Sequence, residues 1–157
     1  MTTSNKINPD FGHWFAGFVD GEGHLGITRV GKSYRCVFTM QLRKDDHAIL
    51  EEIQQTLGMG SIYDLPSYGK DRNGHPTTML MVARKQDVIA LRDIFLEFPL
   101  RAKKATDFDI WSKAVDEWKL HTNRWDTVSW DNMIALKQQL EESRKYVEDE
   151  NGEDPQV

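Results

Sequence analysis

The chain has 157 residues, of which 39% are hydrophobic, so it is long enough for one globular domain with a sizeable core. It contains no run of about 18 apolar residues, and its first ten residues lack an apolar segment, so the sequence predicts neither a membrane span nor a secretory signal. Its single cysteine, Cys36, excludes an internal disulfide and favours an intracellular, reducing compartment.

Charge is distributed unevenly along the chain. The formal net charge is −5, which by itself argues against nucleic-acid binding. However, residues 141–157 hold seven acids and two bases, whereas residues 1–140 hold 18 of each. Between residues 29 and 104, 13 bases outnumber nine acids. A basic middle followed by an acidic end is compatible with DNA binding without requiring it.

The first predicted element is an amphipathic helix over residues 11–21, with Asp10 as its expected N-cap. Its apolar residues recur with helical spacing: Phe11, Trp14, Phe15, Phe18 and Val19. The small pair at 16–17 flanks this stripe and would let a second backbone approach closely. Glycines at positions 21 and 23 are expected to end the helix.

Two alternating segments follow and predict a β-hairpin. Residues 24–30 alternate apolar and polar side chains, and residues 34–44 do so more clearly, with a short turn between them. One face of the second segment carries Tyr34, Cys36, Phe38, Met40 and Leu42. Because the opposite face is mostly polar, the hairpin should cover a core with one face and leave the other free.

The same pattern then repeats along the chain. A helix is predicted from Asp45 or Asp46, either of which would cap it, to Gly58, which would end it. Strands are predicted over residues 60–65 and 77–83, and a further helix over residues 87–95. The order αββαββα indicates a mixed α+β fold with two antiparallel hairpins and with helices packed on one face.

The C-terminal part is predicted to be helical and then disordered. Helices are expected over residues 100–120 and 126–147, the second capped by Ser129. Residues 148–157 are polar and acidic without periodicity, which is typical of a disordered tail. We therefore predict one domain over residues 1–147 followed by this tail.

Two carboxylates, Asp20 and Glu22, stand at the end of the first predicted helix among three glycines. A carboxylate at a helix C-terminus faces the partial negative charge of exposed carbonyls, and burying one is costly without a compensating partner. A cation is therefore expected here, and a divalent metal is the natural candidate. Because positions i and i+2 of a helix do not share a face, the two acids are not expected to share one role.

The segment from Phe15 to Gly23, FAGFVDGEG, resembles the signature motif of the LAGLIDADG homing endonucleases. The αββαββα order over about residues 11–110 is also the order that this family's fold demands. The resemblance implies a saddle of two hairpins for double-stranded DNA. It further implies a Mg²⁺-dependent DNA endonuclease, a phosphodiester hydrolase, with Mn²⁺ or Ca²⁺ able to substitute in binding and with no small-molecule cofactor.

By this resemblance, Glu22 binds the catalytic metal and is the principal catalytic residue. Asp20 is interpreted first as a structural acid that bonds backbone N–H groups where the helix ends, and second as a metal contact. Gly21, between the two acids, is a further candidate at the metal.

Basic residues near the predicted metal come from two segments. Lys44 ends the second predicted strand, where the family has a Gln or Lys that helps to organise active-site water. The segment PLRAKKATDF resembles the part of the family that supplies a basic residue near the scissile phosphate. Arg101 and Lys103 are both candidates for that residue, and general attraction of phosphate is the simpler alternative.

The polar faces of the strands, with the turns and loop that join them, are the candidates for reading DNA. The first hairpin supplies His24, Thr28, Lys32, Arg35, Thr39, Gln41 and Arg43, and the second hairpin with its loop supplies Tyr63, Tyr68, Lys70, Arg72, His75 and Thr77. A twisted ribbon fits the major groove, where Arg can read guanine and Gln can read adenine. Without the motif, the solvated face of an antiparallel sheet would be the simpler interpretation.

One copy of the motif occurs in the chain, and a single acid is weak for cutting both strands of a duplex. The resemblance therefore implies a homodimer in which two motif helices pack about a twofold axis. The predicted interface consists of Phe15, Ala16, Gly17, Val19 and Asp20. A twofold dimer expects a pseudo-palindromic DNA site.

The sequence thus predicts a sequence-specific homing endonuclease of a mobile intron, acting in a bacterium, a phage-infected cell or an organelle. The alternative is a non-cleaving RNA-splicing maturase or DNA-binding regulator on the same fold. A structural α/β dimer that binds no nucleic acid is the third interpretation.

Overall fold

The computed structural model of the chain describes residues 6–65, 74–122 and 129–145. Its elements are α1 (Pro9–Glu22), β1 (Gly23–Val30), β2 (Ser33–Arg43), the 3₁₀ turn η1 (Lys44–Asp46), α2 (His47–Leu57), β3 (Ser61–Leu65), β4 (Thr77–Val82), α3 (Lys85–Glu97), α4 (Lys104–Leu120) and α5 (Asp131–Ser143). The predicted αββαββα order and the two further helices are confirmed.

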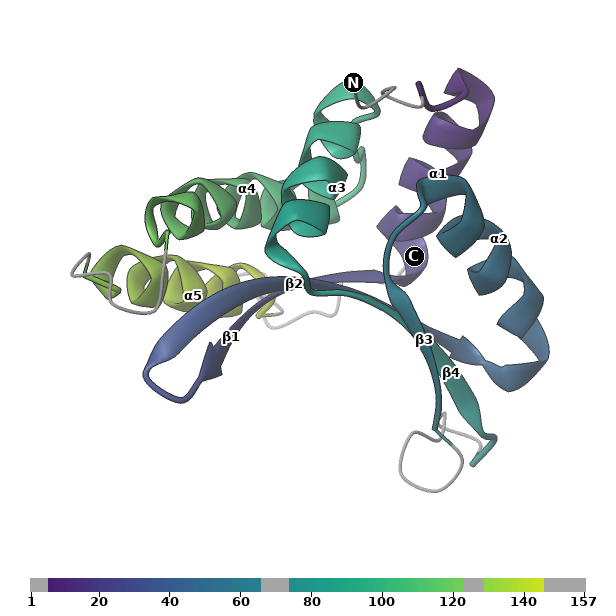
Figure 1. The fold of residues 1–157 in the computed structure, drawn as a ribbon, viewed down its shortest axis with the longest axis horizontal. Coiled ribbons are helices and arrows are strands. Elements are labelled where there is room, and N and C mark those ends of the chain that lie inside the picture. The colour runs from purple at the N-terminus through teal and green to yellow at the C-terminus, as the bar shows by residue number, and fades with distance from the viewer. Residues whose placement is uncertain (1–5, 66–73, 123–128, 146–157) are drawn as a thin grey trace, which may run out of the picture.

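The four strands form one antiparallel sheet in the order β1-β2-β4-β3. The two predicted hairpins are joined edge to edge, because β2 pairs with β1 on one side and with β4 on the other. Figure 1 shows the sheet bent into an arch, with α1 to α4 above it and no helix under its centre. This helix-free concave side is called the saddle face below.

Alternation along the strands sends one set of side chains into the core and the other to the saddle face. Cys36, Phe38 and Met40 of β2 are fully buried, as predicted, under the helices. The ring of Phe15 from α1 lies 6.2 Å from Phe38 and 5.6 Å from Phe95 of α3. These aromatic contacts fix the middle of α1 on the sheet.

The helix limits differ from the prediction where a neighbouring side chain sets them. Asn8, rather than Asp10, caps α1: its Oδ1 accepts a 2.8 Å hydrogen bond from the N–H of Asp10, and Pro9 occupies the first turn, where its missing N–H costs little. Asp46 precedes α2 without a side-chain capping bond. Gly58 ends α2 with φ +68°, a conformation that glycine adopts without strain.

The C-terminal helices are shorter than predicted. α4 begins at Lys104, not Leu100, and α5 begins at Asp131, whose N–H donates to Ser129 Oγ over 3.1 Å. The predicted disordered tail at 148–157 lies outside the described residues, and the domain limit at 147 remains a prediction. No helix in the described ranges is long and apolar enough to cross a bilayer.

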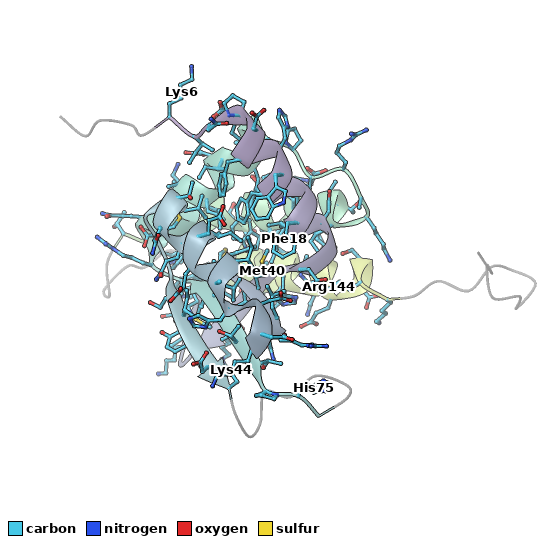
Figure 2. All side chains as sticks on the ribbon, turned by 90° about the vertical axis from the view of Figure 1, so that its right-hand side faces the viewer. Lys6, Phe18, Met40, Lys44, His75 and Arg144 are labelled. Atoms are coloured by element: carbon cyan, nitrogen blue, oxygen red, sulfur yellow. The ribbon has the colours of Figure 1, made fainter. Side chains whose placement is uncertain are left out.

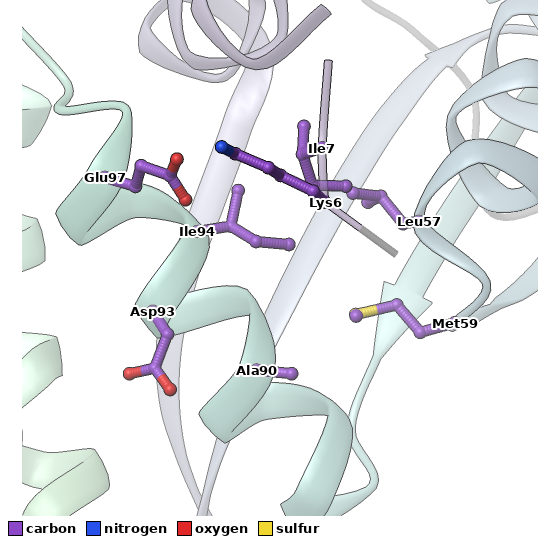
Figure 3. A pocket seen from close by; sticks show the side chains of 8 residues that line it. All are labelled: Lys6, Ile7, Leu57, Met59, Ala90, Asp93, Ile94 and Glu97. Atoms are coloured by element: carbon purple, nitrogen blue, oxygen red, sulfur yellow. The ribbon is translucent and has the colours of Figure 1, made fainter. Parts of the chain in front are cut away.

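A hollow of about 740 Å³ lies between α2 and α3 beside Lys6 and Ile7 (Figure 3). Leu57, Met59 and Ile94 contribute apolar lining. It adjoins the N-terminal end of α1, whereas the motif acids stand at the other end, about 20 Å away for a helix of this length. The hollow is therefore separate from the candidate site.

Candidate active site and nucleic-acid interface

Glu22 is the last residue of α1, and its side chain is exposed. The helix continues through the acid pair, and Gly23 ends it in an extended conformation, with its N–H bonded to Val19 O. Gly23 is also the first residue of β1, where it pairs with Met40 of β2. The motif thus ends in an exposed carboxylate, which lies where α1 meets the sheet.

Asp20 faces another part of the chain. Its Oδ2 accepts a 2.9 Å hydrogen bond from the N–H of Arg101, and its Oδ1 accepts a 3.2 Å bond from the N–H of Ala102. This contact agrees with a structural acid, although the N–H groups belong to the turn before α4 and not to the end of its own helix. Asp20 and Glu22 therefore stand in different surroundings.

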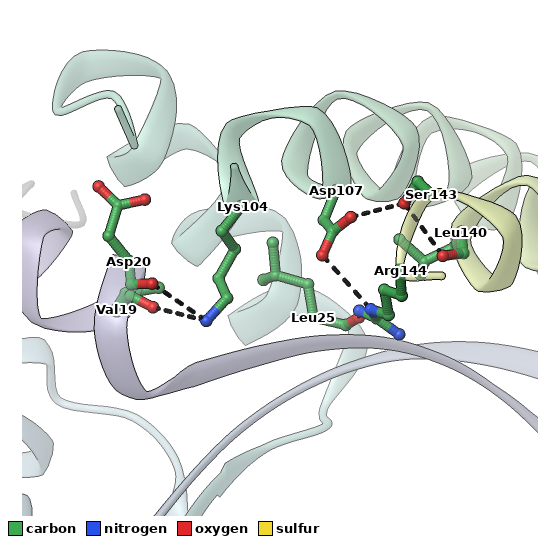
Figure 4. Close-up of polar contacts among 8 residues, drawn as sticks. All are labelled: Val19, Asp20, Leu25, Lys104, Asp107, Leu140, Ser143 and Arg144. Atoms are coloured by element: carbon green, nitrogen blue, oxygen red, sulfur yellow. Dashed lines mark hydrogen bonds and ion pairs between the residues drawn. The ribbon is translucent and has the colours of Figure 1, made fainter. Parts of the chain in front are cut away.

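Lys104 is the cation that the structure brings to the end of α1. Its Nζ lies 3.1 Å from Val19 O and 3.4 Å from Asp20 O, so it caps the helix carbonyls (Figure 4). The pKa of Lys104 is lowered, chiefly by desolvation. The negative charges of Asp107, Asp20 and Glu22 offset part of this effect. Sequence reasoning included Lys104 in the basic segment PLRAKKATDF but did not choose it, because its position depends on where α4 begins.

The predicted basic residues lie close by without these contacts. Arg101 and Lys103 are exposed on the turn that precedes α4. The backbone N–H of Arg101 is held by Asp20, so the turn itself is anchored at the site.

The end of α5 adds a second cation to this region. Arg144 Nε lies 3.3 Å from Asp107 Oδ2, and its guanidinium also donates to Leu25 O (Figure 4). Ser143 Oγ donates to Asp107 Oδ1 over 2.6 Å. A hollow of about 240 Å³ beside Asp20 is lined by Lys103, Lys104, Asp107, Ser143 and Arg144. No sequence motif pointed to Arg144, which lies 119 residues from Leu25.

Lys44, a predicted catalytic residue, follows the end of β2. Gly23 pairs with Met40, so Gln41 is the β2 residue at the level of Glu22. Lys44 lies four residues beyond Met40 along the chain, roughly 13 Å of strand. It lies beside His75 at the far end of the sheet, and its N–H bonds Pro76 O (Figure 2). Lys44 therefore follows the strand beyond the level of Glu22, and its role beside the metal remains a prediction.

Most of the predicted DNA-reading residues of the first hairpin are accessible. His24, Thr28, Lys32, Gln41 and Arg43 are exposed, whereas Arg35 and Thr39 are half-buried. The register pairs His24 with Thr39 and Thr28 with Arg35, so the two members of each pair lie side by side on the same face of the sheet.

Three of these side chains have distinct surroundings. Arg43 donates to the Asp45 carboxylate, which lowers the pKa of that acid. Arg35 Nε is buried and has no hydrogen-bond partner in the part of the chain that the structure describes. Although His24 is exposed, partial desolvation of its ring, followed by the charges of Arg144 and Lys104, lowers its pKa.

The second hairpin is described only in part. Tyr63 is 48% exposed on β3, and His75 is exposed before β4. The prediction that Thr77 is accessible to DNA needs correction, because the residue is only 3% exposed. Its Oγ1 accepts a 2.8 Å hydrogen bond from Gln41 Nε2, so the Gln41 side chain lies over it. Three predicted contacts lie outside the described residues: Tyr68, Lys70 and Arg72.

The predicted dimer interface also needs correction. Phe15, Ala16 and Val19 are at most 3% exposed in the single chain, so their side chains have almost no surface left for a partner. Asp20, half-buried, is bonded to the turn before α4. Of the predicted set, Gly17 alone is exposed.

Another face of α1 is open. A Cβ placed on Gly17 or Gly21 meets no atom within 4 Å. Beside them, the rings of Trp14 and Phe18 stack at 5.4 Å, and Trp14 is 41% exposed. Sequence reasoning placed both aromatics in the core, because a helix with apolar residues on two faces gives no sign of which face is covered.

The donors at the end of α1 fit a hard cation. A carboxylate and backbone carbonyls are oxygen ligands of the kind that Mg²⁺ prefers. Within the described residues no group of three His, Cys, Asp or Glu side chains could hold a metal.

Comparison with known proteins places this geometry in context. The sequence profile of the family described as LAGLIDADG endonuclease matches residues 15–115. A curated relative, the probable intron-encoded endonuclease Cox1-I1b of Schizosaccharomyces pombe, is 30% identical over 119 residues, which are 73% of this chain and 29% of that protein.

Two solved structures illustrate the likeness in fold. The LAGLIDADG homing endonuclease I-GzeII, in complex with its DNA target, superposes with a TM-score of 0.71 at 20% identity over 88% of this chain and 46% of that chain. The archaeal intron-encoded homing endonuclease I-Vdi141I, complexed with DNA, gives 0.70 at 15% identity over 88% and 87% of the two chains. The present chain spans less than half of the first and less than a third of the yeast protein.

Proposed function

The chain belongs to the LAGLIDADG endonuclease family, and we propose from this premise that it is a homing endonuclease that cuts double-stranded DNA. As a homodimer, it would recognise a long pseudo-palindromic site and break both strands in the presence of Mg²⁺. The observation that carries the proposal is the exposed Glu22 at the end of α1, beside the open surface of Gly17 and Gly21.

The open face of α1 supports the homodimer. Two copies packed through Gly17 and Gly21 would bring the helix axes close together, because no Cβ stands between them. The stacked Trp14 and Phe18 would lose their exposed surface in the same contact. A twofold axis along this face would place both Glu22 residues near each other.

The end of α1 is suited to hydrolysis of a phosphodiester. Glu22 and the carbonyl of Gly21 would hold the divalent cation, while the two carboxylate oxygens of Asp20 already accept N–H groups. A bound Mg²⁺ supplies Lewis acidity that activates water and stabilises negative charge on the phosphate. Lys104, held on the carbonyls of Val19 and Asp20, contributes fixed positive charge next to Glu22.

The saddle face would hold the duplex over this site. Its first hairpin presents His24, Thr28, Gln41 and Arg43 as exposed polar groups, which can contact base edges or phosphates. Arg101 and Lys103 remain candidates for phosphate contacts, because the turn that carries them is fixed to Asp20. An intron-encoded relative favours a mobile intron as the source of this chain.

The decisive experiment is cleavage of a randomised plasmid library by the purified chain, followed by sequencing of the new ends. The reaction is run with Mg²⁺, with Ca²⁺ and with EDTA. Glu22→Gln is compared with Glu52→Gln, which changes an exposed acid on α2. We expect defined ends with Mg²⁺ for the wild type and for Glu52→Gln, and none for Glu22→Gln.

Two results would overturn the proposal. Cleavage by Glu22→Gln at the wild-type rate would remove Glu22 from the mechanism. Absence of any cleaved DNA, together with tight binding of RNA in a parallel selection, would favour the maturase.

A further inference from the structure

Two methionines occupy the centre of the β2–β4–β3 part of the saddle face. Gln41 of β2 and Tyr63 of β3 both pair with Met79 of β4. In the next row, Thr39 and Ser61 both pair with Met81. Because directly paired residues of a sheet share a face, each methionine lies between two residues of the saddle face.

These methionines form an apolar patch on the saddle face. Met79 and Met81 are half-buried, and Tyr63 beside them is 48% exposed. Together with the β3 residues 62–65 they line a shallow hollow that opens to solvent. The core side of the same strand is filled by Leu80 and Val82, both fully buried, so the methionines are not needed there.

Resting on the proposed function, we propose that Met79 and Met81 determine specificity by packing against thymine C5-methyl groups in the major groove. A thymine methyl is the apolar group that a standard base pair shows there, while the other edges are donors and acceptors. A thioether covering such a donor or acceptor would leave it without a partner, at a cost in binding. The patch therefore selects A·T pairs beneath it.

The spacing of the two residues predicts the spacing of the thymines. Met79 and Met81 are two residues apart on one strand, about 6.8 Å. Base pairs rise by about 3.4 Å, so the two contacts fall roughly two base pairs apart. Gln41, in the row of Met79, is suited to the adenine of the same or the neighbouring pair.

The test uses the DNA site obtained from the library selection. Thymines in each half-site are replaced singly by deoxyuridine, which lacks only the methyl group, and binding is measured in Ca²⁺. We expect about four-fold weaker binding for each contacted methyl removed. This loss should occur at two positions in each half-site, and Met79→Gln or Met81→Gln should each abolish it at one of them.

Matched variants separate this contact from general effects. Met79→Leu and Met81→Leu keep an apolar side chain and should keep most of the deoxyuridine effect. Leu96→Gln, which removes an apolar residue that is 58% exposed on α3, should leave the effect unchanged.

The outcomes distinguish this inference from the proposed function. A chain that selects no DNA at all overturns both. A chain that selects and cuts DNA, but tolerates deoxyuridine at every position, overturns the methyl contact alone. A Met79→Gln protein with unchanged DNA preference and an altered oligomeric state would show that the patch binds protein, and would also overturn it.

Discussion

The carboxylate of Asp20 accepts a 2.9 Å hydrogen bond from the backbone N–H of Arg101, a residue 81 positions further along the chain. A second bond, from Ala102, binds the other oxygen. The end of α1 and the turn before α4 are thereby held as one unit, so the acid next to Glu22 sets the position of a basic segment. This relationship leads to the first prediction.

Asp20→Ala should destabilise the protein by about 1–3 kcal/mol, because two backbone N–H groups lose a charged acceptor. Asp109→Ala, an exposed aspartate on α4, is the matched control and should change stability by less than about 0.5 kcal/mol. Urea unfolding followed by circular dichroism measures both. Equal stability of the two variants would show that the Asp20 contacts contribute nothing.

Gly17→Leu and Gly12→Ala should have opposite effects. A side chain at Gly17 meets open space in the single chain, so Gly17→Leu should preserve or raise helix stability by about 0.5–1 kcal/mol while blocking dimerisation. A Cβ at Gly12 would lie 2.5 Å from the Phe98 ring, and overpacking of this kind costs about 1–3 kcal/mol. Sedimentation and thermal unfolding separate the effects. An unchanged sedimentation coefficient for Gly17→Leu would place the dimer contact elsewhere.

Cys36 should be inert in the folded protein. Its thiol is fully buried, and desolvation raises its pKa from 9.0 to about 12. Alkylation by iodoacetamide at pH 8 should therefore be very slow until urea unfolds the chain. With the pKa raised on folding, the protonated thiol favours the folded state below pH 9, and this contribution is lost as the pH rises towards 12. Rapid labelling without urea would contradict the buried position.

Trp111→Phe should destabilise the protein by about 1–3 kcal/mol, because the buried carbonyl of Gly26 loses the 3.1 Å bond from Trp111 Nε1. Trp14→Phe, at an exposed tryptophan of α1, is the control and should have little effect on the stability of the single chain. Chemical unfolding of both variants at low protein concentration measures the difference. A smaller loss for Trp111→Phe than for Trp14→Phe would contradict this assignment.

The periodicity of the sequence predicted the framework because burial of one face dominates the pattern. In β2, the alternation from Cys36 to Met40 identified the core face correctly. It could not identify the exposed face of β4, since Met79 and Met81 alternate with residues that are equally apolar. Only the pairing with Gln41 and Tyr63 shows which side they occupy.

The candidate site was predictable only where the local motif fixes it. The end of α1 follows from its own residues, so the motif located Glu22. That Lys104, and not Arg101 or Lys103, lies on the carbonyls at the end of α1 depends on a turn held by Asp20, which is a long-range contact. The level of Lys44 relative to Glu22 depends on the strand register, set by Gly23 and Met40, which cannot be read from one strand alone.

The docking of α5 on β1 has a consequence for how the protein is made. β1 is an edge strand, and Arg144, after the end of α5, bonds the carbonyl of Leu25. These residues are 119 positions apart, so at roughly 5–20 residues per second the ribosome leaves β1 without this contact for on the order of ten seconds. An uncovered strand edge can pair with other chains during that interval. Slow translation or early termination before residue 131 should therefore favour aggregation of the nascent chain.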